Sequence, residues 1–79
     1  MARIIEITWH DSCAAGGGWE HIDNLSTMAL STCRSVGYLT SKDKKKIILA
    51  QSYAKNDTEL MNVIAIPRGC VESIRELGL

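Results

Sequence analysis

The residues best suited to chemistry crowd into positions 9–21, WHDSCAAGGGWEH, near the start of the chain. This stretch holds both tryptophans, both histidines, one of the three cysteines and three of the six glycines. A thiol beside an imidazole can act as a nucleophile or bind a metal, and a glycine run before a helix can bind phosphate. The stretch therefore admits four interpretations: an active site, a metal site, an anion site or a structural loop.

Nucleophilic catalysis would use Cys13 as the thiolate, with His10 or His21 as the neighbouring base. Such a site also needs a group that stabilises the oxyanion, and the sequence contains no motif for one. A chain of 79 residues leaves little room for a deep cleft beside its core. We therefore expect the protein not to be an enzyme, and we interpret Cys13 as a small structural residue.

Zinc binding is the second interpretation, because His10, Cys13, His21 and Cys33 are all suitable ligands. Their spacing, H-x2-C-x7-H-x11-C, matches no familiar zinc finger or knuckle. Structural zinc sites normally bring a close pair of ligands from each end of the motif. We expect neither a metal nor another cofactor.

Phosphate binding by Gly16, Gly17 and Gly18 has a physical basis, since free N–H groups and a following helix attract anions. The lysine and hydroxyl of a P-loop are missing, because Trp19 and Glu20 stand where they would be. Acidic residues at the start of the helix would also compete with an anion. Gly17 and Gly18 remain candidate ligand contacts, and the alternative is that the glycines let the loop fold back over the domain.

Three further residues have both a structural and a ligand-binding interpretation. Trp9 is most simply core, and Trp19 most simply fills the mouth of the fold, although an indole can also stack on a base. Asp11 can contact a ligand or cap the backbone of its own loop, and local capping is the commoner outcome. We keep Trp19 and Asp11 as candidate ligand-binding residues.

Composition limits the partners. Nine Lys plus Arg balance nine Asp plus Glu, so a compact ligand is expected rather than a long nucleic acid, whose binding requires many cations. An odd cysteine count without a C-x-x-C pair favours a reducing compartment, and we expect a cytoplasmic protein. The sequence shows neither a signal peptide nor an apolar run long enough for a membrane span. We expect a single domain over residues 1–79.

Apolar periodicity predicts a mainly β chain. Strands are expected at residues 3–9, 36–40, 46–53, 61–66 and 71–76. One short, weak helix is expected in the long loop after the first strand, from Trp19 on, because Ile22, Leu25, Ala29 and Cys33 recur at helical spacing. Helical periodicity also fits residues 70–77, but the resemblance to small phage-encoded proteins described below favours a bulged strand over residues 71–76.

The order of these elements resembles a small SH3-like or Sm-like barrel, with the long loop in the place of an SH3 RT loop. Residues 66–74, IPRGCVESI, are similar to the second Sm motif, in which a strand ends in Arg-Gly and apolar residues then begin the last strand. The resemblance implies a five-stranded barrel. It also implies that Arg68 lies near a ligand pocket, and an ion pair with an acid such as Glu72 is the structural alternative.

The whole chain also resembles a set of small phage-encoded hypothetical proteins. The shared landmarks are Trp9 with Asp11, Gly18-Trp19, Ser35 to Leu39, Leu49 to Ser52, and Ile66-Pro67 through Ser73-Ile74. This resemblance implies a location in the host cytoplasm and an accessory function for a phage.

Two classes of function remain. The first is a non-enzymatic, homo-oligomeric phage accessory protein that binds a nucleotide-like or small anionic ligand at a subunit interface, in the manner of anti-defence proteins that sequester nucleotide signals. The second is a protein-binding module that docks on a host or virion protein through the long loop or the barrel edge. The candidate ligand-binding residues are Arg68, Trp19, Asp11, Gly17 and Gly18.

Overall fold

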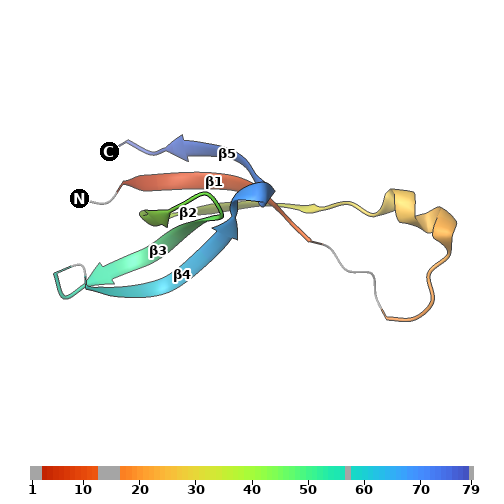
Figure 1. Cartoon of the computed structure of the whole chain (residues 1–79), viewed down its shortest axis with the longest axis horizontal. Helices are drawn as coiled ribbons and strands as arrows, with labels where there is room; N and C mark the ends of the chain where they lie inside the picture. The colour runs from red at the N-terminus through yellow and green to blue at the C-terminus, as the bar shows by residue number, and fades with distance from the viewer. Residues whose placement is uncertain (1–2, 13–16, 57, 79) are drawn as a thin grey trace.

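The computed structural model describes residues 3–12, 17–56 and 58–78, and these form a five-stranded antiparallel sheet in the order β4-β3-β2-β1-β5 (Figure 1). The strands are β1 (Ile4–Asp11), β2 (Ser31–Lys42), β3 (Lys46–Ala54), β4 (Glu59–Pro67) and β5 (Val71–Glu76). Two 3-10 turns, η1 (Ile22–Thr27) and η2 (Arg68–Cys70), precede β2 and β5. The expected mainly β fold with five strands is confirmed, and residues 71–76 are a strand rather than a helix.

Alternation along β1 sets the two faces of the sheet. Ile5 and Ile7 are buried on the inner face, while Glu6 and Thr8 point to the outer face, as the period of two in a strand requires. β-branched residues favour this extended backbone. The buried core consists of Ile5, Ile7, Ile47, Leu49 and Ile66, with Trp9, Leu39 and Val71 packed against it. It is a small core for the length of the chain.

Bulges curve the sheet around this core. One shifts the register between Leu39 and Ser41 in the β2–β3 pair, and Thr40 at that point donates its Oγ1 hydroxyl to the Ile48 carbonyl at 2.8 Å. A second lies between Thr8 and Trp9 where β1 pairs with β5. Extra residues of this kind bend a strand and increase its twist. The bulge expected for the last strand is therefore present in its pairing with β1.

The sheet is open. β4 pairs with β3 alone and β5 with β1 alone, so both are edge strands and the described residues form no ladder between them. Barrel closure requires that the two edges hydrogen-bond to each other. The sheet therefore does not form the closed SH3-like or Sm-like barrel expected from the resemblance.

The structure differs from two expectations about the long loop: that it contains a helix and that it folds back over the domain (Figure 1). Residues 17–30 project away from the sheet (Figure 1), and the helical part is only the six-residue turn η1. Cys33, which the helical spacing included, lies in β2. Because Ile22 and Leu25 are exposed, they have no surface on which burial could stabilise an α-helix. In the described ranges, no helix has the length and apolar character needed to cross a membrane.

Candidate functional site

Residues 17–30, which we call the arm, carry the three most exposed large apolar side chains that the structure describes: Trp19, Ile22 and Leu30. Trp19 is fully exposed, so the expectation that it fills the mouth of the fold is wrong for a single chain. The hydrogen bonds that hold η1 are local, for example from the Asn24 N–H to the His21 carbonyl at 2.9 Å. The arm thus presents an apolar surface that its own sheet does not cover.

Gly17 and Gly18 are the first described residues of the arm, and Asp11 ends β1. Gly18 has a φ of +109°, a conformation that favours glycine, and nothing lies within 4 Å of an added Cβ there. Asp11 Oδ1 accepts a hydrogen bond from the Ser12 N–H at 2.9 Å, which is the local capping expected as the structural alternative. Gly16 is outside the described residues. Among the residues that the structure describes, no helix N-terminus for a phosphate follows the glycines, because η1 is a short 3-10 turn.

The four candidate zinc ligands are dispersed. His10 and Cys33 lie on opposite faces of the sheet, since Cys33 pairs with Trp9 and Thr32 pairs with His10. His21 lies in the arm, with Nδ1 3.4 Å from Asp23 Oδ2, and Cys13 is outside the described residues. Among the described side chains, no group of three or more His, Cys, Asp or Glu is arranged to hold a metal ion.

Arg68 begins η2 and is exposed, and its backbone N–H donates to the Lys45 carbonyl at 2.8 Å. This contact places it beside the lysine-rich turn between β2 and β3. Glu72, the acid expected as its ion-pair partner, instead has Oε2 3.6 Å from His10 Nε2. None of the sequence-predicted residues Arg68, Trp19, Asp11, Gly17 and Gly18 lines either of the two cavities described next.

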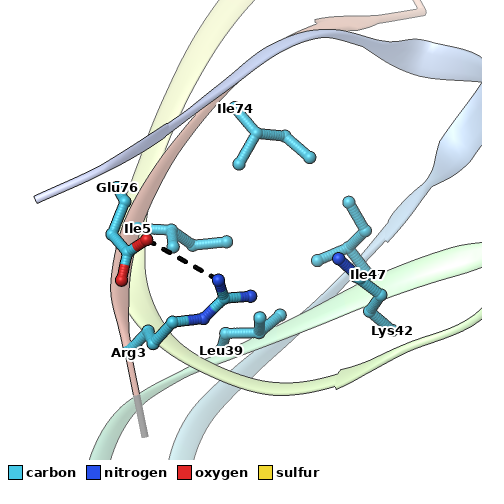
Figure 2. Close-up of a pocket in the computed structure, with 7 residues that line it drawn as sticks. All are labelled: Arg3, Ile5, Leu39, Lys42, Ile47, Ile74 and Glu76. Carbon is cyan, nitrogen blue, oxygen red and sulfur yellow. Dashed lines mark ion pairs between the residues drawn. The ribbon is translucent and has the colours of Figure 1, made fainter.

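The first cavity, which we call the sheet pocket, lies on the inner face and has a volume of about 310 Å³ (Figure 2). It is lined by Arg3, Ile5, Leu39, Lys42, Ile47, Ile74 and Glu76. Figure 2 shows Ile5 and Ile47 on opposite sides of the pocket, with Arg3 Nη1 3.6 Å from Glu76 Oε2 at one edge. Four apolar side chains thus surround a space that this chain leaves unfilled.

The second cavity, which we call the outer cleft, is a wider depression of about 540 Å³ on the outer face of β1, β2 and β5. It is lined by Glu6, Thr8, Thr32, Arg34, Glu72, Ser73 and Arg75. Arg75 Nη2 lies 3.2 Å from Glu6 Oε1. Arg34, in contrast, has no acidic partner among the described residues. The cleft therefore combines an unpaired guanidinium with three hydroxyl groups.

Sequence reasoning missed Arg34 and Arg75, because it placed the start of the second strand at residue 36 and chose its candidate ligand-binding residues from the long loop and the Arg-Gly motif. The signal was present in the alternation Thr32, Arg34, Val36, which puts Arg34 on the face opposite to Cys33. That Arg34 lies opposite Thr8 depends on how the strands pair, which the sequence alone does not predict.

Comparison with protein-family models, curated proteins and solved structures finds no match to this chain.

Proposed function

We propose that this chain is a non-enzymatic binding protein that takes a compact anionic ligand in the outer cleft and works as a homo-oligomer. The observation that carries the proposal is the unpaired guanidinium of Arg34 at a cleft that also holds the hydroxyl-bearing residues Thr8, Thr32 and Ser73. A planar guanidinium can donate two parallel hydrogen bonds to phosphate or carboxylate, and hydroxyls add further donors. The cleft volume of about 540 Å³ falls within the usual range for small-ligand sites.

The ligand that fits this description best is nucleotide-like. Glu72 in the same cleft gives acceptors for the N–H groups of a base, while the unpaired Arg34 gives donors for phosphate. Glu6 and Arg75 are already paired with each other. The balanced net charge favours a single small anion over a polymer. The resemblance to small phage proteins supports a specific form of this function, in which the protein sequesters a nucleotide signal of host defence.

Calorimetric titration with inorganic phosphate, AMP and 3′,5′-cyclic AMP tests the proposal. We expect at least one nucleotide to bind, and Arg34→Gln to weaken that binding at least about tenfold because a charge-assisted contact is lost. Lys44→Gln is the matched control, since it removes an exposed cation outside the cleft. Failure of all three probes to bind at about 1 mM would contradict the proposal.

A second candidate function is docking on a host or virion protein. The observation that favours it is the exposed apolar surface of the arm, together with the unpaired edges of β4 and β5. Host-protein docking predicts that Trp19→Ala abolishes capture of one specific protein while binding of nucleotide to the outer cleft is unchanged. If Arg34→Gln abolished capture of the host protein as well as nucleotide binding, this second candidate would be contradicted.

A further inference from the structure

The arm and the sheet pocket are two incomplete apolar surfaces of the same chain. Trp19, Ile22 and Leu30 are exposed on the arm, while the pocket is walled by isoleucine and leucine side chains. Ile74 belongs to the inner face because it pairs with the fully buried Ile7, yet 44% of Ile74 is exposed. Apolar surfaces of this kind are normally covered in the assembled protein.

The surface area of the chain indicates how much is uncovered. A folded monomer of 79 residues is expected to expose about 4,700 Å², whereas this chain exposes 6254 Å². Its radius of gyration is 16.3 Å, against about 11.6 Å for a globular chain of this length. A stable interface of standard size buries about 800 Å² on each partner. The excess of about 1,500 Å² is therefore enough for an extensive interface on every copy.

The pocket is large enough for an indole, and its lining suits one. A cavity of about 150 Å³ lined by apolar side chains is known to take up benzene, and the sheet pocket has about twice that volume, 310 Å³. Two cations, Arg3 and Lys42, line the same pocket, and cations are favourable neighbours for a tryptophan ring. Trp19 is the one fully exposed tryptophan of the described residues.

The chain's own arm points away from its own pocket. The arm leaves the sheet at the Asp11–Ser31 pair, whereas Arg3 and Ile5 line the pocket at the opposite end of β1. Figure 1 shows the arm and the two chain termini at opposite ends of the molecule. An arm that fills this pocket therefore comes from another copy.

Charge complementarity also favours a second copy. The arm carries Glu20 and Asp23 and no lysine or arginine. Glu20 directly follows Trp19, so an indole in the pocket brings this carboxylate to the pocket rim, which Lys42 also lines. Lys42 has no acidic partner among the described residues, which leaves it available to a carboxylate from outside the chain.

We propose that the arm of one copy packs along the sheet of a second copy, with the Trp19 indole seated in the partner's sheet pocket and Glu20 beside Lys42. In a two-fold dimer both pockets are filled reciprocally, and the assembly closes. This inference deepens the homo-oligomeric part of the proposed function and is independent of the ligand in the outer cleft.

Native mass spectrometry and sedimentation of the full chain test the proposal. We expect a discrete oligomer for the wild type, and at least about a 30-fold rise in its dissociation constant for Trp19→Ala, as for a buried tryptophan at an interface centre. Ile74→Asp is expected to have a comparable effect from the pocket side. Met61→Ala removes an exposed apolar side chain of β4, outside arm and pocket, and is expected to leave association unchanged.

Mixing the two defective variants gives the sharper test. The Trp19→Ala variant has an intact sheet pocket, and the Ile74→Asp variant has an intact arm. In an equimolar mixture the arm of Ile74→Asp can therefore bind the pocket of Trp19→Ala. We expect mixed oligomers that neither variant forms alone. In a Trp9→Phe background, the fluorescence of the remaining Trp19 is expected to shift to the blue as protein concentration rises. Circular dichroism checks that both variants keep the sheet.

Three results would overturn the inference: a wild-type monomer, an oligomer that Trp19→Ala leaves intact, or a mixture without mixed oligomers. A wild-type monomer whose arm is protected by a purified host protein would assign the arm to that partner instead. Titration of Trp19→Ala with AMP and 3′,5′-cyclic AMP tests the ligand proposal separately from the association of two copies, since no residue of the arm lines the outer cleft.

Discussion

Ile7 and Ile74 lie directly opposite each other on β1 and β5, yet Ile7 is fully buried and 44% of Ile74 is exposed. Residues paired in this way share one face of the sheet, so both belong to the inner face. The core therefore stops between these two side chains, and the sheet pocket begins where it stops. One pair of isoleucines thus marks the boundary between the surface that a single chain buries and the surface that it leaves for a partner.

Alanine substitution of the two isoleucines is expected to give unequal losses of stability. Ile7→Ala removes fully buried methyl groups and is expected to lower the free energy of unfolding by about 2–5 kcal/mol. Ile74→Ala, measured on dilute monomer, is expected to cost clearly less because part of the side chain already contacts water. Urea denaturation at several protein concentrations checks both values, and equal losses in dilute monomer would place the core boundary elsewhere.

The sheet itself was predictable from local patterns. Ile5 and Ile7 alternate with polar neighbours, and the apolar runs at 46–53 and 61–66 lie between turn residues, which is why the strands were found near their observed positions. The periodicity of the last strand does not predict a strand, because helical spacing fits residues 70–77 equally well. There, the strand was expected only from the resemblance to the small phage proteins, and the pairing of β5 with β1 is what shows it.

The arm was not predictable, because its conformation depends on contacts that local sequence does not encode. The spacing of Ile22, Leu25, Ala29 and Cys33 suits an amphipathic helix, but such a helix needs a surface against which its apolar face can pack. Within one chain that surface is absent from the described residues, and Cys33 joins the sheet instead. The outer cleft was missed for a related reason, since Arg34 and Ser73 meet only through their separate pairing with Thr8.

Gly37→Ala is expected to destabilise the β2–β3 pair. A Cβ at this position would lie 2.8 Å from the Ala50 carbonyl oxygen and 3.3 Å from Leu49 Cβ, so the backbone has to shift. We expect a loss of about 1–3 kcal/mol in the free energy of unfolding, as for other overpacked sites. Gly69→Ala is the control, because nothing lies within 4 Å of its added Cβ, and thermal or urea unfolding should barely distinguish it from wild type.

Ser35→Ala is expected to weaken the packing of Trp9. The indole Nε1–H donates to Ser35 Oγ at 3.0 Å in a half-buried position, and the alanine variant leaves this donor without its acceptor. The expected loss is about 1 kcal/mol, with a change in Trp9 fluorescence, measured in a Trp19→Ala background. Ser41→Ala, at an exposed position of β2, is expected to change neither quantity. Unaltered stability and emission in Ser35→Ala would show that the hydrogen bond contributes nothing.

Asp43→Ala is expected to have an effect on stability that depends on pH. The N–H groups of Lys45 and Lys46 donate to Asp43 Oδ1 at 2.7 and 2.9 Å, and these hydrogen bonds lower the pKa of the carboxyl below its ordinary value of 3.8. Because the pKa is lower in the folded state, ionised Asp43 stabilises the β2–β3 turn above pH 3.8, and this contribution is lost as the pH falls through the folded-state pKa.

The corresponding measurement is urea denaturation of wild type and Asp43→Ala across the acid range. The gap between their free energies of unfolding is expected to be constant near neutral pH and to narrow below pH 3.8. Lys44→Ala serves as the control within the same turn, because its side chain takes no part in the hydrogen bonds to Asp43. A gap that stays the same at every pH would mean that the turn is held by its backbone alone, through the Asp43 N–H that donates to the Lys46 carbonyl at 3.0 Å.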